Sequence, residues 1–242
     1  MKAILTFHSI DDSGSVLSFG PRMFADLVQG LLKSGLKICS LDELLMESSD
    51  QAVALTFDDG MRSVFQNALP VLRDAGVPAH LFLTTGYVGR DNQWPTQPSD
   101  GPKMDLMDWS EIEACGAAGM LVECHTVNHP DLRSLSPEQV QEECAAADAM
   151  IEDRLGRKPQ HFAYPYGFYN DDVSCITAQR YRSCVTTELR SLRTSDASRQ
   201  LPRLDSYYLQ HRRLYGNLFA GSTRAYLTAR NQMRKLKQRF EP

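Results

Sequence analysis

The chain has 242 residues, of which 42% are apolar and 23% charged; this is ordinary for a soluble globular protein and enough for one large α/β domain. No apolar run reaches the ~18 residues that a membrane-spanning helix needs. The start, "MKAILTFHSIDD", has an apolar part too short for a signal peptide and no small-residue cleavage site, so we expect a cytoplasmic protein.

Strand-like and helix-like segments alternate along the chain. The predicted strands are short apolar runs, and the predicted helices carry apolar residues at helical spacing. The best marked helix begins with a capping box formed by Ser136 and Gln139, and it ends at Gly156. In chain order we predict a strand at 3–7, a helix at 21–35, a strand at 37–40, a helix at 40–45, a strand at 52–57, a helix at 63–76 bent at Pro70, a strand at 79–84, a helix at 108–119, a strand at 120–124, a helix at 136–156, a strand at 161–165, a helix at 173–180, and strands at 181–187 and 201–209.

This alternation indicates parallel strands joined by helices. About seven such units predict a single barrel-like α/β domain, and a doubly wound open sheet is the alternative. The chain contains no GxGxxG or GxxxxGK[ST] sequence, which removes the usual anchor of a nucleotide-binding fold. The polar segment 86–107 is unusually long for a loop, and such loops are usually functional or mobile.

The six cysteines form no CxxC pair. Their spacing fits neither a zinc ribbon nor a disulfide framework. We therefore expect reduced thiols that are mostly buried. They are Cys39, Cys115, Cys124, Cys144, Cys175 and Cys184.

Polar residues capable of chemistry follow four of the predicted strands. In a parallel barrel the residues after each strand lie on one face, where active sites collect. Four polar groups at one rim indicate an active site more strongly than any one of them does. They are His8, the pair Asp58 and Asp59, the pair His125 and His129, and the segment 164–166.

The sequence "HTVNH" places His125 and His129 four residues apart. Two imidazoles and a carboxylate make a three-ligand metal site with an open position for water. If one of the adjacent aspartates ligates the metal, the cation offsets the repulsion between the two carboxylates. The other carboxylate can then stay ionised and act as a general base. Alone, the aspartates could equally form a helix cap, and the histidines could be structural.

Three segments, "TFDDG" (56–60), "HTVNH" (125–129) and "FAYPYG" (162–167), resemble the three main motifs of the NodB-type polysaccharide deacetylases, carbohydrate esterase family 4. The resemblance covers roughly residues 1–210, with the motifs in the family order. It implies a distorted (β/α)7 barrel that removes the N-acetyl group of an amino sugar. It also implies a divalent metal, for which zinc, cobalt and nickel all fit.

The resemblance also implies roles for single residues. Asp58 resembles the catalytic base, and Asp59 resembles the carboxylate that ligates the metal. His125 and His129 are similar to the metal imidazoles. The backbone N–H of Tyr166 resembles the donor to the oxyanion.

The chain departs from the family pattern at two points. Ala163 stands where the third motif usually has an arginine that orients the base, and no leucine–any–histidine motif that would supply the acid follows convincingly. However, "LTFHSI" is similar to the circularly permuted members, in which the acid histidine comes first, so we expect His8 to protonate the leaving amine. The last predicted strand would lie beside it, with Arg203 replacing the missing arginine near Asp58 and Asp205 holding His8 protonated.

The chain ends in a basic segment. Residues 211–242 carry a net charge of +7 and the rest of the chain −11. We therefore divide the chain into a NodB-like deacetylase domain at 1–215 and a basic amphipathic helix at 216–242. Two interpretations of this helix stay open: it docks on the barrel, or it contacts an anionic membrane surface peripherally, which would place the protein at the inner face of the membrane.

We expect an N-deacetylase that acts on a nucleotide- or lipid-linked amino-sugar precursor, or on an oligosaccharide, in surface polysaccharide biosynthesis, without a nucleic-acid partner. The alternatives are a hydrolase of a small non-sugar amide, an inactive sugar-binding homologue and an iron oxygenase with two histidines and a carboxylate. In the long loop, Trp94 is a candidate platform for sugar stacking. His80 is predicted to be structural, since it lies inside an apolar strand.

Overall fold

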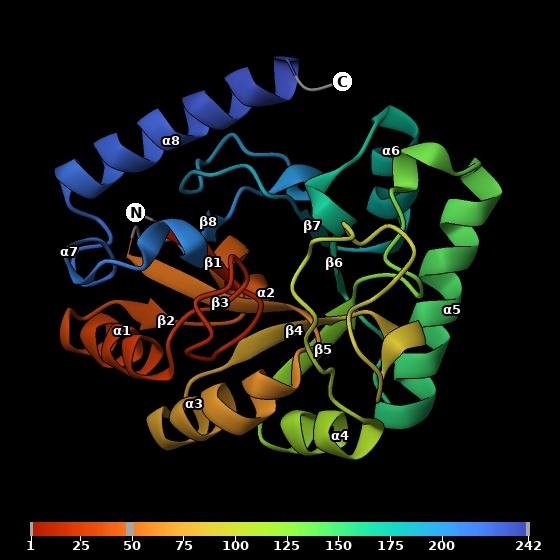
Figure 1. Cartoon of the computed structure of the whole chain (residues 1–242), viewed down its shortest axis with the longest axis horizontal. Coiled ribbons are helices and arrows are strands. Elements are labelled where there is room, and N and C mark those ends of the chain that lie inside the picture. Colours follow the sequence, from red (N-terminus) through yellow and green to blue (C-terminus); the bar gives the residue numbers. More distant parts are fainter. Residues whose placement is uncertain (1, 47–50, 241–242) are drawn as a thin grey trace.

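The computed structural model describes residues 2–46 and 51–240. Its centre is one curled sheet of parallel strands in the order β7-β6-β5-β4-β3-β1-β8, with β2 paired to β3. Helices surround this sheet, and the last helix, α8, runs along one side of the molecule (Figure 1). The strands are β1 (Lys2–Phe7), β2 (Lys37–Ile38), β3 (Ala52–Asp59), β4 (Ala79–Leu83), β5 (Met120–Cys124), β6 (His161–Ala163), β7 (Ser183–Val185) and β8 (Leu204–Asp205).

The first six helices connect successive strands, as the alternation of the sequence predicts, and the last two follow β8. They are α1 (Pro21–Lys33), α2 (Leu41–Met46), α3 (Leu69–Ala75), α4 (Trp109–Ala117), α5 (Pro137–Leu155), α6 (Asp171–Arg180), α7 (Arg212–Tyr215) and α8 (Gly221–Phe240). The predicted distorted barrel is confirmed as a single domain with a curled, half-barrel sheet, and the doubly wound open sheet is wrong.

The first and last strands are neighbours, because Leu5 of β1 pairs with Leu204 of β8. Three residues earlier, Leu201 bridges to Val185 of β7 and donates its N–H to the Cys184 carbonyl at 2.9 Å. Segment 201–205 therefore fills the seam between the two edges of the sheet. We call it the seam segment.

The last predicted strand, 201–209, is much shorter in the structure. Only Leu204 and Asp205 pair with β1, and residues 206–209 form a 3₁₀ turn. Pro202 interrupts any regular ladder because it has no backbone N–H. The chain also changes partner within the seam segment, from β7 to β1, so neither edge receives a long strand.

The predicted bend at Pro70 appears as a change of helix type. Residues Val64–Ala68 form a π-helical turn, and α3 begins directly after it with Pro70 in its first turn. Proline is tolerated there because the first N–H groups of a helix have no partner within the helix.

Helix α8 packs on the barrel through its first half, where Thr223 and Leu227 are buried. Tyr226, Met233 and Leu236 are exposed. None of the helices in the described part of the chain is long and apolar enough to cross a membrane. The expectation of free, mostly buried thiols is confirmed, since Cys175 alone among the six cysteines is exposed.

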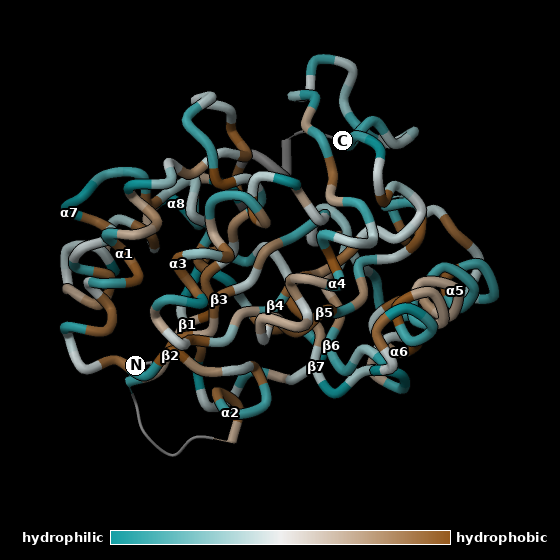
Figure 2. Tube along the Cα trace, turned by 90° about the horizontal axis from the view of Figure 1, so that it is seen from below, coloured by the Kyte–Doolittle hydropathy of each residue, from teal (hydrophilic) through white to brown (hydrophobic). Residues whose placement is uncertain are grey.

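The outer face of the sheet packs against the helices through a layer of aromatic rings. Phe24 of α1 contacts Phe7 of β1 and Phe57 of β3, with ring centroids 5.3 and 5.7 Å apart. All three side chains are fully buried. Figure 2 shows the hydrophobic residues concentrated along the central strands and on the inward sides of the helices.

We expect Phe24→Ala to lower the free energy of unfolding by about 3–5 kcal/mol, because it leaves a cavity between α1 and the sheet. Urea unfolding followed by circular dichroism measures this loss. Leu32→Ala on the same helix is the control, since the partly exposed Leu32 side chain should cost much less. Equal losses in the two variants would contradict the assigned packing of α1.

Candidate metal and catalytic site

The register of the sheet brings the predicted polar residues to one rim. Phe7 pairs with Phe57, so His8 and Asp58 leave neighbouring strands at the same level. Asp59 pairs with Leu83, whose carbonyl accepts a hydrogen bond from the His125 N–H at 3.1 Å. The carboxyl ends of β1, β3 and β5 therefore converge on one site.

Asp59, His125 and His129 form a compact three-residue group. The Asp59 Oδ1 atom lies 3.4 Å from Nε2 of His125 and 3.4 Å from Nε2 of His129. A tetrahedral ion with ligand bonds of about 2.0–2.1 Å has ligand atoms about 3.3–3.4 Å apart. All three side chains are buried. The spacing therefore fits a zinc-sized cation.

The hydrogen bonds of this group leave the ligand atoms free. The Nδ1 atom of His125 lies 2.7 Å from the Ala163 carbonyl, which can only accept, so Nδ1 carries the proton and Nε2 keeps its lone pair. Asp59 Oδ1 is buried, and no described residue donates a hydrogen bond to it. A buried carboxylate oxygen without a donor is costly, and a cation would relieve that cost. The residues present thus fit a divalent metal.

The pKa values of His129 and Asp59 put both groups in the form that binds a metal. Burial lowers the pKa of His129 to about 3, so its imidazole is neutral near pH 7. Burial by itself would raise the pKa of Asp59, but the close approach of His125 and the nearby imidazoles hold it well below its usual range. Burial would also lower the pKa of His125, but its close approach to Asp59 and the charges of the two aspartates raise it, so a metal would replace a proton on this ring.

Asp58 is held by Arg203 of the seam segment. The guanidinium donates to both carboxylate oxygens, Nη1 to Oδ1 at 2.7 Å and Nη2 to Oδ2 at 2.6 Å. Its Nε donates to the Thr186 carbonyl at 2.9 Å. Burial would raise the pKa of Asp58, but the guanidinium outweighs burial and lowers it. Arg203 therefore fixes the orientation of the carboxylate and keeps it ionised, although it is far from the third motif in sequence.

The site carries unusual backbone strain. Four residues other than glycine have positive φ in the described chain, and all four belong to the site or adjoin it: Asp59 at 71°, Thr126 at 69°, His129 at 51° and Tyr166 at 58°. Such conformations cost energy for residues with a Cβ and persist only where the surrounding structure enforces them. The strain indicates that the positions of the site residues are maintained at the cost of local backbone stability.

Segment 86–107 folds over the metal-site histidine. Trp94 stacks on the His129 ring with centroids 4.2 Å apart, and its Nε1 donates to the Tyr166 hydroxyl at 2.9 Å. Thr96 donates to the His129 carbonyl at 2.8 Å and accepts from the Tyr166 hydroxyl at 3.0 Å. Because Trp94 is only 4% exposed, it supports His129 and is not an open sugar-stacking platform.

His8 and Asp205, the two residues expected around the leaving group, have different described contacts. His8 is half-buried at the end of β1, close enough to influence the charge state of Asp58 and Asp59. Asp205 instead accepts from the Tyr207 N–H at 2.9 Å and caps the following turn. No described ion pair or hydrogen bond joins Asp205 to His8, so the role expected for Asp205 stays a prediction.

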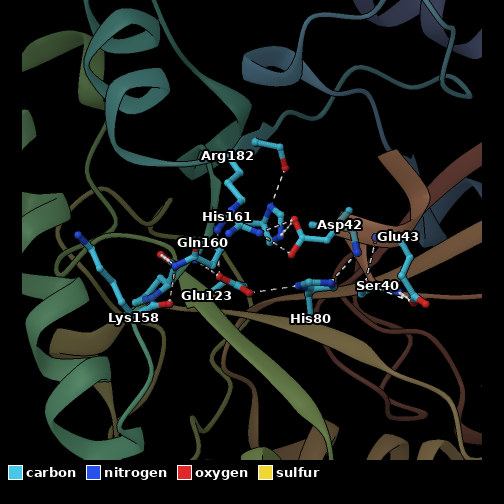
Figure 3. A network of polar contacts seen from close by, with 12 residues as sticks. Ser40, Asp42, Glu43, His80, Glu123, Lys158, Gln160, His161 and Arg182 are labelled. Atoms are coloured by element: carbon cyan, nitrogen blue, oxygen red, sulfur yellow. Dashed lines mark hydrogen bonds and ion pairs between the residues drawn. The ribbon is translucent and has the colours of Figure 1, made fainter. Parts of the chain in front are cut away.

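A second group of similar residues, His80, Glu123 and His161, is fully buried inside the curled sheet (Figure 3). His80 Nδ1 lies 3.4 Å from Glu123 Oε1. However, the Leu41 N–H donates to His80 Nε2 at 2.9 Å, which puts the imidazole proton on Nδ1 and directs it at the carboxylate. Nδ1 therefore carries a proton and has no lone pair free to bind a metal.

Glu123 is also satisfied without an ion. Its Oε1 accepts from Arg157 at 2.9 Å, and its Oε2 accepts from the backbone N–H groups of Gln160 and His161 at 2.6 and 3.0 Å. Burial would raise the pKa of this carboxyl, but His80, His161 and Arg157 lower it to about 2. The second group is a polar lock between β4, β5 and β6, which agrees with the predicted structural role of His80.

The family model described as "Polysaccharide deacetylase" matches residues 46–182, more than half of the chain. The chain belongs to this family. The matched range includes Asp58, Asp59, His125, His129 and Tyr166, whereas His8 and Arg203 lie outside it.

Named relatives of this polysaccharide deacetylase family member are distant. YxkH of Bacillus subtilis (strain 168) is 28% identical over 192 residues, which cover 76% of this chain and 64% of the relative. A "Poly-beta-1,6-N-acetyl-D-glucosamine N-deacetylase" of Staphylococcus aureus (strain MSSA476) is 27% identical over 171 residues, which cover 64% of this chain and 56% of the relative. The chain thus matches less than two thirds of the length of both curated relatives.

Solved structures of similar proteins share the fold. IcaB from Ammonifex degensii has a TM-score of 0.71 and 27% identity, over 85% of this chain and 93% of that one. The Streptococcus pyogenes deacetylase PplD, in complex with acetate, has a TM-score of 0.73 over 84% of this chain and 91% of that one, and its 24% identity shows the fold alone. The circular permutation and the individual catalytic roles in our chain stay predictions.

Three supports of the site were missed from the sequence. Thr96 and the indole N–H of Trp94 hold the Tyr166 hydroxyl, and the Ala163 carbonyl orients His125. No local pattern indicates such contacts. The length of segment 86–107 and the tryptophan within it were the signals that this loop matters.

We expect Asp59→Asn and His129→Ala to lose bound zinc, because each removes a ligand of a three-residue site. Plasma mass spectrometry after zinc loading and desalting measures the metal-to-protein ratio. His161→Asn is the matched control, since it changes a histidine of the second group and should keep a ratio near that of the unaltered chain. Loss of zinc in the control alone would contradict our assignment, because it would show that the second group binds the metal.

We expect Glu123→Gln to lower the free energy of unfolding near pH 7 by about 3 kcal/mol, because buried donors lose their charged acceptor. The folded pKa of about 2 lies below the ordinary value of 4.5, so this stability is present above pH 4.5 and is lost as the pH falls through 2. The deficit of the variant should therefore shrink below pH 4.5 in urea unfolding. Glu113→Gln, in an exposed ion pair, is the control, and a deficit independent of pH would contradict the assignment.

Proposed function

We propose that this chain is a metal-dependent N-deacetylase that removes the acetyl group of an N-acetylated amino sugar. The observation that carries the proposal is the joint placement of a three-ligand group and an arginine-held carboxylate, Asp58, at one strained rim. The names of the Staphylococcus aureus relative and of the family support a sugar amide as substrate. The finer form of the proposal is a nucleotide- or lipid-linked precursor handled inside the cell.

A divalent metal held by Asp59, His125 and His129 would supply Lewis acidity, which polarises an amide carbonyl and lowers the pKa of water. The other side chains account for the remaining chemistry. Asp58 is ionised and held by two hydrogen bonds from Arg203, so it can accept the proton of the attacking water. The pair thus supplies an oriented base.

The developing oxyanion and the leaving amine need separate donors. The backbone N–H of Tyr166 donates to no described residue, and the positive φ of this residue sets its direction. His8 lies at the end of the neighbouring strand and can protonate the departing amine, which leaves with acetate as the second product. Base and acid thus come from adjacent strands, β3 and β1.

The buried pair of Arg203 and Asp58 argues against two of the alternative functions. Ala163 favoured an inactive homologue because the motif arginine is missing, but Arg203 supplies a guanidinium to Asp58 from another part of the chain. An iron oxygenase would give this oriented carboxylate no task. We therefore favour hydrolysis over both alternatives.

We expect zinc-loaded protein to remove one acetyl group from members of a panel of N-acetylated nucleotide sugars, polyprenyl-linked sugars and N-acetylglucosamine oligomers, measured by mass spectrometry. Asp58→Asn should slow the reaction by about 10²–10⁴-fold, because the base is lost while the metal ligands stay. Its metal content is the control. Unchanged turnover by Asp58→Asn would refute the assigned base, and no deacetylation of any sugar by the metal-loaded chain would refute the function.

We expect Arg203→Lys to lower kcat by about 10²-fold without loss of metal, because an ammonium cannot hold both oxygens of Asp58 and small misplacements of a base are costly. Steady-state kinetics and metal analysis measure the two quantities. Thermal unfolding distinguishes a loss of kcat from misfolding. We expect the variant to stay folded, because lysine keeps the buried positive charge. Turnover equal to that of the unaltered chain would reject the role of Arg203.

A further inference from the structure

Helix α8 reaches the rim of the site through one arginine. Its first half is anchored by the buried residues Thr223 and Leu227. Further along, Arg234 donates from Nη1 to the Thr187 carbonyl at 3.0 Å, and its guanidinium lies over the Tyr208 ring at 5.7 Å. The helix therefore has a directed contact with the segment that follows β7.

Two arginines hold three consecutive carbonyls of this segment. The Thr186 carbonyl accepts from Arg203 Nε at 2.9 Å, and the Glu188 carbonyl accepts from the Arg203 N–H at 3.0 Å. The carbonyl between them, that of Thr187, accepts from Arg234. The seam segment thus fixes two of these peptide groups, and α8 fixes the one in the middle.

Thr187 in turn supports the turn that carries Tyr166. A Cβ added at Gly167 would lie 2.2 Å from Thr187 Oγ1, so the threonine side chain rests directly against this glycine. The same hydroxyl donates to the Tyr166 carbonyl at 3.4 Å. Because Tyr166 has a φ of 58°, its conformation depends on such external support.

We infer that Arg234 is a positioning residue for the Tyr166 N–H, acting through Thr187 and Gly167. This inference rests on the proposed function for the meaning of that N–H. Its physical part, that α8 holds the turn in place, does not. The C-terminal helix then helps to position a group of the site, in addition to covering the barrel.

The inference predicts a particular kinetic signature. The oxyanion develops only in the transition state, so a misplaced donor lowers kcat and leaves KM nearly unchanged. Removal of a donor outright costs about 10²–10³-fold in kcat. Arg234→Ala displaces the donor without removing it, and we expect a loss of about tenfold.

The chain offers a matched control on the same helix. Arg230 lies one turn earlier and stacks on the same Tyr208 ring at 5.1 Å, but no described hydrogen bond joins it to the Thr187 carbonyl that Arg234 holds. Arg230→Ala removes the same charge and a similar ring contact, so it should keep the kcat of the unaltered chain. Arg234→Lys keeps a charged donor and should recover part of the activity.

A second readout does not depend on activity. The Gly167 and Phe168 N–H groups bond to the Tyr164 and Pro165 carbonyls at 2.8 and 3.0 Å within the turn. Hydrogen exchange of a peptide covering 164–168 should be several-fold faster in Arg234→Ala than in Arg230→Ala. Metal content and melting temperature of both variants are measured alongside.

The two readouts separate the possible failures. Slower kcat and faster exchange in Arg234→Ala, with Arg230→Ala unchanged in both, would support the inference. Unchanged exchange, or equal losses of kcat in the two variants, would overturn it. If the unaltered chain deacetylates no sugar but exchange still changes in Arg234→Ala alone, the proposed function fails while the link between α8 and the turn stands.

Discussion

The buried pair between Arg203 and Asp58 joins the closure of the barrel to the geometry of the site. Arg203 lies in the seam segment, which pairs with β7 at Leu201 and with β1 at Leu204. A buried guanidinium is costly unless its donors are satisfied, and here it makes four hydrogen bonds, to Thr56, Asp58 and Thr186. The seam can therefore close with this side chain inside only if Asp58 is ionised and oriented toward it.

The described residues include two buried polar groups of similar composition, the metal-site group and the second group, and Phe82 neighbours His80 of the second group and Arg203. Its ring lies 6.4 Å from the His80 ring and 5.9 Å from the Arg203 guanidinium. Both groups combine histidines with a carboxylate, yet their hydrogen bonds differ. The Ala163 carbonyl leaves Nε2 of His125 free for an ion, whereas the Leu41 N–H occupies the corresponding atom of His80. One backbone group for each ring thus decides between a metal site and a structural lock.

Segments that are distant in sequence stabilise the strained backbone conformations at the rim. The positive φ of His129 is held by Trp94 and Thr96 of the long loop, and that of Tyr166 by Thr187 from the segment after β7. The supports of these two backbone conformations come from connections between strands. The strands set the level at which the reactive groups leave the sheet, and the connections set their final direction.

The sequence by itself determined the alternation of strands and helices, the parallel sheet and the clustering of His8, Asp58, Asp59, His125 and His129 at one rim. These features are local: apolar periodicity and motif spacing act over a few residues, and parallel strands bring their carboxyl ends together without further information. Only the tertiary structure decided the short last strand, the partner of Asp205, the burial of Trp94 and the contact of Arg234. Those depend on curvature, on the register between edges far apart in the chain and on which backbone group meets each side chain. No local pattern encodes these relations, because the partners are separated by tens of residues or more.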